Sequence, residues 1–218
     1  SADGIAFDAV TAVERVPIQV HIPGGFMVYN TLDVLAAAQA LGVSLTESAA
    51  VLAKVPHVQG RVEVVPTPGK DYAILIDYAH TPDSMVNVLQ TVKEFAKGRT
   101  VAVFGCGGDR DKTKRPPMGK AAADWSDFAV VTTDNPRTED PAAIIEDILP
   151  GFTGSKTPYK VVVDRVEAIH WAMDHAEKDD VIVLCGKGHE TYRDREGVKT
   201  PFLERELLEE YAQQIGLE

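Results

Sequence analysis

The chain has 218 residues, of which 44% are hydrophobic and 25% charged, and its formal net charge is -11. This composition is typical of a soluble globular protein with one large domain or one and a fraction, and the negative charge argues against a nucleic-acid surface, which needs a basic footprint. No apolar run approaches the ~18 residues of a membrane-spanning helix, and no secretory signal is visible. Two cysteines cannot form a disulfide framework, so we expect reduced thiols and a cytoplasmic location.

The amino-terminal part predicts a strand followed by a helix. Residues Arg15–Ile22 alternate apolar and polar side chains, as a half-buried strand does. Asn30 is a candidate cap for a helix that runs to Gly42.

A second, shorter helix is predicted after Gly42. Ser44 and Glu47 have the spacing of a capping box, and the helix is expected to end near Val55. Prolines and glycines between His57 and Lys70 then end the helical pair. We therefore expect a boundary near Gly60.

Beyond this boundary, strands and helices alternate. Five apolar runs predict strands: Tyr72–Asp77, Thr100–Phe104, Phe128–Thr132, Tyr159–Val163 and Val181–Cys185. Helix starts are predicted at Thr81-Pro82, Asp140-Pro141 and Asp164 with Glu167. Continuous apolar strands joined by helices indicate an α/β fold with a mainly parallel sheet covered on both faces. A polar hairpin over Arg193–Pro201 and a helix over Glu204–Ile215 complete the chain.

Unusual residues gather where four of these strands end. The segments are Asp77–Pro82, Gly105–Lys112, Asp134–Arg137 and Gly186–Glu190. Ligands of open α/β sheets bind beyond the carboxyl ends of the strands, so these loops predict one site at one rim.

Each loop also has a structural interpretation. Glycines 105, 107 and 108 can serve only to turn the chain, and Asp134-Asn135-Pro136 can be a turn, although a turn needs no Arg137. His80 and His189 can be surface histidines. The basic run Lys112, Lys114 and Arg115 is usually a solvated face, although beside Arg110 it could attract a carboxylate or phosphate.

Several chemistries find no motif in the sequence. It contains no GxGxxG, HExxH or GxSxG, and no metal site or catalytic residue is assigned. It also contains no GxxxxGK[ST], so a complete cradle for a triphosphate is missing.

Together the four loops closely resemble the Mur ligases, and most of all the members that add diaminopimelate. The motifs that carry the resemblance are Asp77-Tyr78-Ala79-His80-Thr81-Pro82-Asp83, Phe104–Lys112, Asp134-Asn135-Pro136-Arg137 and Gly186-Lys187-Gly188-His189-Glu190. Their order and spacing agree with the family, and the upstream segments Asn30–Ala37 and Gly60–Glu63 are also similar to it.

The resemblance implies a division into two parts. Residues 1–60 would be the tail of a central ATP-binding domain, and residues 61–218 a Rossmann-like carboxy-terminal domain that binds the amino acid. The phosphate loop and the Mg²⁺ ligands would lie before Ser1, so the chain alone is expected to be inactive.

The resemblance further implies an ATP- and Mg²⁺-dependent ligation of meso-diaminopimelate to a UDP-linked muramoyl dipeptide in peptidoglycan synthesis. ATP would turn a carboxylate into an acyl phosphate, which the amine then attacks. Small molecules are thus the expected partners, with no nucleic acid and no membrane. Two alternatives stay open: the lysine-adding version of the ligase, and a Rossmann-like binding module without catalysis.

Site residues carry over position by position from the family motifs. The residues implied to hold diaminopimelate are Arg110, Asp134, Asn135, Pro136, Arg137, Gly186 and Glu190. Those implied to reach the nucleotide are Asn30, Arg61, Asp77 and His80. One departure is Met27, where the family often has asparagine and a polar contact near the nucleotide.

Overall fold

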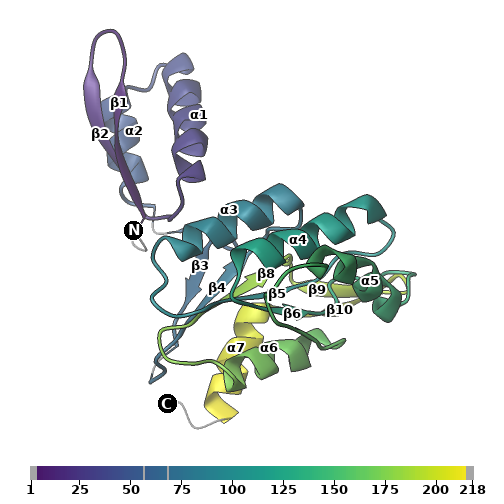
Figure 1. Cartoon of the computed structure of the whole chain (residues 1–218). Coiled ribbons are helices and arrows are strands. Elements are labelled where there is room, and N and C mark those ends of the chain that lie inside the picture. The colour runs from purple at the N-terminus through teal and green to yellow at the C-terminus, as the bar shows by residue number, and fades with distance from the viewer. Residues whose placement is uncertain (1–3, 56, 68, 215–218) are drawn as a thin grey trace.

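The computed structural model describes residues 4–55, 57–67 and 69–214, with side chains described as far as residue 211. Its largest element is a six-stranded sheet with the order β3-β4-β8-β5-β6-β7 (Figure 1). The strands are β3 (Glu63–Val65), β4 (Ala73–Asp77), β5 (Thr100–Phe104), β6 (Phe128–Val131), β7 (Tyr159–Val161) and β8 (Val181–Cys185). All neighbours pair in parallel except β3, which is antiparallel to β4. The predicted α/β fold class is confirmed.

Helices cover both faces of this sheet. One face packs against α3 (Pro82–Lys93), α4 (Arg115–Trp125) and α5 (Pro141–Ile148), and the other against α6 (Arg165–Asp174) and α7 (Glu204–Gln214) (Figure 1). Strand residues alternate between the two cores: Ala102 and Phe104 of β5 face the first, and Val101 and Val103 the second. Burial on both faces explains why these strands are continuous apolar runs.

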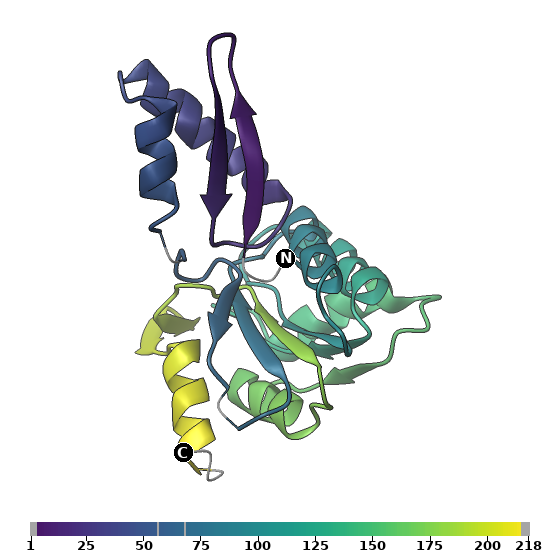
Figure 2. The ribbon, with the colours of Figure 1, turned by 90° about the vertical axis from the view of Figure 1, so that its left-hand side faces the viewer.

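A smaller unit, residues 4–55, has a core of its own and is called the N-terminal unit below. It contains the hairpin of β1 (Ile5–Val10) and β2 (Arg15–Val20) and the helices α1 (Phe26–Ala40) and α2 (Leu45–Leu52). Its core consists of Ala9, Ile18, Val20, Ile22, Leu35 and Leu45. The unit extends away from the sheet (Figure 2). The predicted capping box of α2 is present, with Ser44 and Glu47 bonding reciprocally.

One predicted helix start is wrong. Helix α1 begins at Phe26, and its cap is Gly25, which has no side-chain capping bond. Asn30 instead lies in the second helical turn, because backbone bonds from Met27 to Gly24 and from Val28 to Gly25 start the helix earlier. Strands β1 and β3 were not predicted.

The hairpin after the sheet is confirmed as β9 (Tyr192–Arg195) and β10 (Val198–Pro201). Its turn residues Glu196 and Gly197 both have positive φ, which suits a two-residue turn between twisted strands. Residue Ile215, the expected end of the last helix, lies outside the described residues. No helix in the described ranges is long and apolar enough to cross a membrane.

Two 3-10 turns complete the elements, at Lys112–Lys114 and Leu149–Phe152.

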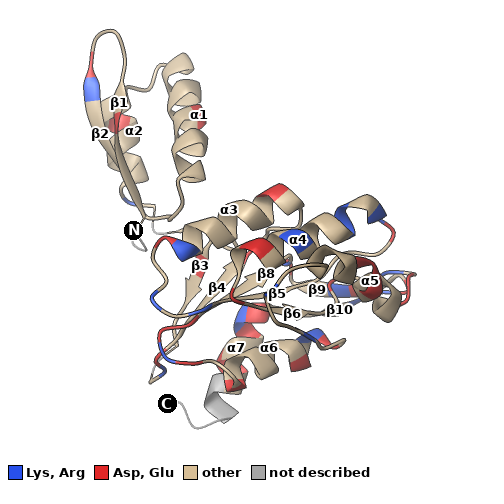
Figure 3. Ribbon diagram, in the orientation of Figure 1, with Lys and Arg blue, Asp and Glu red and all other residues tan. Residues whose placement is uncertain are grey.

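Basic and acidic segments alternate over the helices and loops around the sheet, while the N-terminal unit carries few of either (Figure 3). Many basic side chains are paired with nearby carboxylates, as Arg99 is with Asp180 at 2.6 Å.

Candidate functional site

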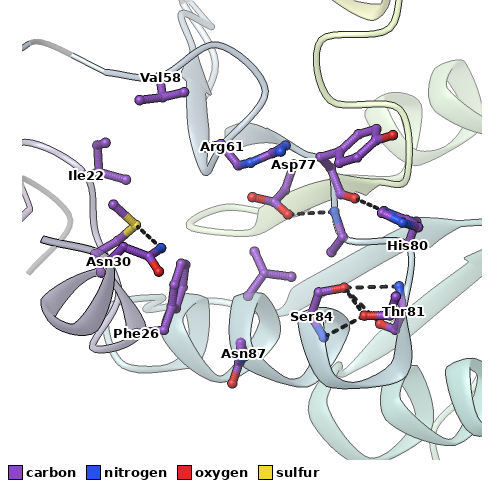
Figure 4. A pocket seen from close by; sticks show the side chains of 14 residues that line it. Ile22, Phe26, Asn30, Val58, Arg61, Asp77, His80, Thr81, Ser84 and Asn87 are labelled. Carbon is purple, nitrogen blue, oxygen red and sulfur yellow. Dashed lines mark hydrogen bonds between the residues drawn. The ribbon is translucent and has the colours of Figure 1, made fainter. Parts of the chain in front are cut away.

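A pocket of about 430 Å³ lies between the N-terminal unit and the carboxyl end of β4 (Figure 4). It is lined by Ile22, Phe26, Met27, Asn30, Val58, Arg61, Asp77, Tyr78, Ala79, His80, Thr81, Ser84, Asn87 and Val88. All the residues expected to reach the nucleotide, Asn30, Arg61, Asp77 and His80, are among them. We call this hollow the inter-unit pocket.

Asp77 organises the floor of the inter-unit pocket. Its carboxylate accepts hydrogen bonds from the backbone N–H of Val62 at 2.8 Å and of Ala79 at 2.7 Å. Burial raises the pKa of Asp77, although these two bonds act in the opposite direction. Asp77 thus joins the chain around Val62, which has a φ of 44°, to the loop after β4.

The ring of Tyr78 is surrounded by cationic and aromatic groups. The Arg61 guanidinium carbon lies 4.7 Å from the ring centroid, and the rings of His80 and His189 lie at 4.6 and 5.1 Å. His80 is fixed by a 2.8 Å contact of Nδ1 with the Tyr78 carbonyl, and its own carbonyl accepts from Lys114 at 2.8 Å. The arrangement offers positive charge and flat surfaces to an anionic, aromatic ligand.

Asn30 and Met27 contribute to the same pocket from α1. The Asn30 amide donates to Met27 Sδ at 3.5 Å, a weak contact that an anionic ligand group could replace (Figure 4). Opposite them, Thr81 and Ser84 cap α3 reciprocally. The predicted cap-then-proline start of this helix is confirmed.

The residues expected to hold diaminopimelate gather at the ends of β5, β6 and β8. Two loops meet here: Gly108 N donates to the Asn135 carbonyl at 2.9 Å. A Cβ on Gly108 would lie 1.9 Å from the Pro136 carbonyl oxygen, so only glycine allows this approach. The glycine therefore has a packing role: it allows the loop after β5 to approach the loop after β6.

Arg137 has a backbone conformation that is unusual for a residue with a side chain, with a φ of 52°. The β9–β10 hairpin holds it there: Arg137 N donates to the Asp194 carbonyl at 3.1 Å, and Glu196 N donates to the Arg137 carbonyl at 2.7 Å. Backbone strain kept in place by such contacts is common at ligand sites.

The Arg137 side chain is half anchored. Its Nη1 donates to the Gly108 carbonyl at 2.7 Å, and within the described part of the chain no hydrogen bond uses Nε or Nη2. A Cβ on Gly107 would lie 2.9 Å from Arg137 Nη1 and 3.8 Å from Arg110 Cγ, so both arginines approach the same point. The free edge of Arg137 has the geometry for two parallel bonds to a carboxylate.

Asn135 and Glu190 are joined directly across the rim. The Asn135 amide donates to Glu190 Oε2 at 2.9 Å. Gly186, with a φ of 116°, lies against Asp134: a Cβ there would be 2.9 Å from Asp134 Oδ2. Asp134 and Pro136 also line a second hollow of about 620 Å³ beside the hairpin.

The centre of this cluster is Lys187, for which the sequence predicts no role. Lys187 is 0% exposed, and its Nζ lies 3.0 Å from Asn135 Oδ1, 3.0 Å from the Tyr192 carbonyl and 3.3 Å from both Glu190 Oε2 and Asp134 Oδ1. The available signal was its position between two glycines directly after a buried strand. We call Asp134, Asn135, Lys187 and Glu190 the rim cluster.

The expectation for the basic run is wrong for Arg115. Its side chain is buried and pairs with Glu139 at 2.9 Å and Asp147 at 2.8 Å, so it is neither a solvated face nor free to bind an anion. Lys112 also pairs with Glu139, at 2.9 Å. These contacts tie the start of α4 to α5 through Asp147 and to the chain before α5 through Glu139.

Glu139 supplies a pH-dependent part of this tie. Its bonds to Arg115, then Lys112 and the Asp109 N–H lower its pKa from 4.5 to about 2. Because the pKa of Glu139 is lower in the folded than in the unfolded state, its ionised form stabilises the folded protein at pH values above about 4.5. This stabilisation is lost as the pH falls from about 4.5 towards 2. The melting temperature of Glu139→Gln should therefore lie below that of the parent at pH 7, with the difference closing in this window. The exposed Glu146→Gln is the control, and a difference independent of pH would contradict the assignment.

Neither cysteine is suited to nucleophilic chemistry. Cys106 and Cys185 are free and buried, and burial raises the pKa of Cys106 to about 12 and also raises the pKa of Cys185. Among the described residues, no group of three His, Cys, Asp or Glu side chains could hold a metal ion.

Curated relatives match this chain over nearly its whole length. The UDP-N-acetylmuramoyl-L-alanyl-D-glutamate–2,6-diaminopimelate ligase of Clostridioides difficile (strain 630) is 46% identical over 209 residues, which are 96% of this chain and 43% of the relative. The ligase of the same name from Caldanaerobacter subterraneus subsp. tengcongensis is 46% identical over 210 residues, again 96% and 43%. The chain thus spans less than half the length of these relatives.

Solved structures extend the comparison to the fold. A structure of a UDP-N-acetylmuramoyl-L-alanyl-D-glutamate–2,6-diaminopimelate ligase superimposes with a TM-score of 0.70 at 35% identity, covering 99% of this chain and 44% of that one. Folylpolyglutamate synthase of Mycobacterium tuberculosis shares the fold, with a TM-score of 0.60 at 20% identity over 83% of this chain and 44% of that one. The family model "Mur ligase, glutamate ligase domain" matches residues 60–188. The chain belongs to the Mur ligase family.

Proposed function

We propose that this chain is the carboxy-terminal part of an ATP-dependent ligase that adds meso-2,6-diaminopimelate to UDP-N-acetylmuramoyl-L-alanyl-D-glutamate in peptidoglycan synthesis. The names of the relatives support this reaction. In the proposal, residues 1–60 complete a central ATP-binding domain, and residues 61–218 bind the incoming amino acid. The enzyme would work in the cytoplasm, with ATP and Mg²⁺ held mainly by the central domain.

The observation that carries the choice of amino acid is the free edge of Arg137. Diaminopimelate and lysine share an amine end and an aliphatic stem, and they differ by one carboxylate. Arg137 Nε and Nη2 can donate to that carboxylate in parallel, while Nη1 stays on the Gly108 carbonyl. Lysine would leave this guanidinium without its partner. A site for diaminopimelate is therefore favoured over one for lysine.

Glu190 supplies the complementary charge. Its Oε2 is used by Asn135 and Lys187, and no described residue bonds to Oε1, which can accept from an ammonium of the ligand. Arg110 is exposed beside Arg137 and can add a second cation for a carboxylate. Glu190 and the two arginines thus offer a negative and two positive partners to the ammonium and carboxylate groups of a zwitterionic amino acid.

The chemistry that this chain would assist is the attack of an amine on an acyl phosphate. The nitrogen lone pair of the neutral amine forms the C–N bond, the C–O bond to phosphate breaks, and inorganic phosphate leaves with the electron pair. The proton that the nitrogen loses passes to the leaving phosphate or to water. The proposed role of the rim is to hold the amine in the attacking geometry, where orientation can contribute several kcal/mol, up to about 7–11. The inter-unit pocket would bind part of the nucleotide through Asn30, Arg61, Asp77 and His80.

Titration of the chain separates this proposal from its alternatives. By calorimetry, meso-diaminopimelate should bind at least about tenfold more tightly than L-lysine. The reason is that the Arg137 guanidinium is paired in the complex with diaminopimelate and unpaired in the complex with lysine. Equal affinities for the two amino acids would favour the lysine-adding ligase or contradict the assignment of diaminopimelate to this site. Binding of neither amino acid would favour a module of another kind.

A second measurement tests the division into two parts. Without a GxxxxGK[ST] loop the chain should release no phosphate from ATP, because backbone donors and magnesium must neutralise the transferring phosphoryl group. The assay is phosphate release with ATP, Mg²⁺ and both ligase substrates present. Magnesium-dependent turnover by the pure chain would contradict the proposed division.

A further inference from the structure

We propose that Lys187 is a positioning residue for the amino-acid site, which orients Asn135 and Glu190 towards the ligand without contacting the ligand itself. The inference rests on the proposed function. A lysine with 0% exposure is unusual, because a buried charge is costly unless it is paired and hydrogen-bonded. Lys187 meets that condition entirely with groups of the site and of the hairpin.

The contacts of Lys187 exclude direct binding. Its ammonium donates to Asn135 Oδ1, to the Tyr192 carbonyl and to Glu190 Oε2, at 3.0, 3.0 and 3.3 Å. These contacts use the hydrogens that an ammonium carries. The ligand must therefore be met by the neighbours of Lys187, which keep free atoms.

Lys187 and the backbone N–H of Asp194 together determine which way the Asn135 amide faces. Asn135 Oδ1 accepts from Lys187 and from the Asp194 N–H at 2.9 Å, so its Nδ2 must point towards Glu190, to which it donates at 2.9 Å. A flipped amide would set its NH₂ group against two donors. The bond from Asn135 then holds Glu190 Oε2, which leaves Oε1 directed to other partners.

Lys187 also balances the charge of the site. Asp134 and Glu190 both lie 3.3 Å from its Nζ. Without the ammonium, these two carboxylates would share the site with no cation between them, and like charges at short range repel. Glu190 would then turn away from Asp134 and lose its place beside a ligand ammonium.

The test replaces Lys187 by methionine, an unbranched side chain one atom shorter than lysine, which fills most of the same space and removes the charge. Calorimetric titration of the chain with meso-diaminopimelate should show an affinity at least about tenfold weaker than in the parent, in the range of coupling within one polar network. Lys156→Met, at an exposed lysine on the loop before β7, is the matched control and should bind as the parent does. Unchanged affinity in Lys187→Met would overturn the inference.

A double-mutant cycle separates positioning from general stability. In a Glu190→Gln background the carboxylate that Lys187 orients is absent, so adding Lys187→Met should weaken binding by less than about threefold. A lysine that only stabilises the fold would weaken binding by the same factor in both backgrounds. Equal factors would therefore contradict the positioning role.

A measurement on the parent covers the case in which Lys187→Met does not fold. With ¹⁵N-labelled lysine side chains, Lys187 should give a slowly exchanging ammonium signal that shifts when meso-diaminopimelate saturates the chain. If the Lys187 ammonium signal did not shift at saturation, the inference about Lys187 would be refuted and the proposed function would stand. A parent chain that binds no diaminopimelate would instead refute the proposed function.

Discussion

Replacing Arg137 by alanine is expected to weaken meso-diaminopimelate binding by roughly a hundredfold while leaving L-lysine binding nearly unchanged. The variant lacks the free guanidinium edge that can grip the second carboxylate. Truncating one partner of such a charge pair typically costs about 2–5 kcal/mol, which is a factor of roughly 30 or more. Calorimetry on the chain gives both constants, and in a ligase containing it the KM for diaminopimelate should rise while that for ATP barely changes.

Two further variants sharpen this result. Arg137→Lys should recover only part of the affinity, because an ammonium cannot reproduce two parallel donors. Arg15→Ala, at an exposed arginine in the β1–β2 hairpin, should bind diaminopimelate like the parent. If Arg137→Ala bound diaminopimelate as tightly as the parent, the specificity assignment would be wrong even with the family intact.

The parallel part of the sheet could be predicted because its strands are buried on both faces. Strand β8 consists of five residues that are all buried, and the sequence there is continuously apolar. Strand β3 gave no such signal, since Glu63 is buried within it. The Glu63 carboxylate accepts a hydrogen bond from Gly60 N at 2.6 Å and pairs with Arg205, which is 142 positions away. Because the partner that permits this burial is so distant, hydropathy could not reveal the strand.

The helix start in the N-terminal unit was missed for a local reason. Asn30 has good capping chemistry, but α1 begins at Phe26 after a glycine pair. The next residue, Thr31, also lies inside the helix, where its hydroxyl donates to the Met27 carbonyl at 2.7 Å. Capping propensity identified that a helix was present here and failed to place its first turn.

The rim could be predicted because the carboxyl ends of parallel strands meet at one edge. Asn135 and Glu190, 55 residues apart, are hydrogen-bonded there as neighbours. Lys187 was passed over because lysine is rarely buried, and its burial depends on Asn135 and the Tyr192 carbonyl from two other segments. Arg115 was misjudged for the same reason: its carboxylate partners Glu139 and Asp147 lie 24 and 32 residues away.

A second buried arginine connects the rim to the end of the chain. Arg165, with 0% exposure, donates to Glu204 Oε1 at 2.7 Å and to the carbonyl of Cys185, the last residue of β8, at 2.9 Å. It also reaches the Thr133 carbonyl, at 3.4 Å. One side chain thus joins α6, the ends of β6 and β8, and the start of α7, directly before the loops that form the rim.

Glu204→Ala is therefore expected to destabilise the chain by about 3–5 kcal/mol, because removing one partner leaves the Arg165 charge buried without its carboxylate. For a chain of this size that corresponds to a fall in melting temperature of roughly 10 °C. Thermal denaturation at neutral pH measures the change, and Glu210→Ala, at an exposed position of the same helix, should move the melting temperature by no more than about 2 °C. Similar melting temperatures for the two variants would mean that α7 does not depend on the buried pair.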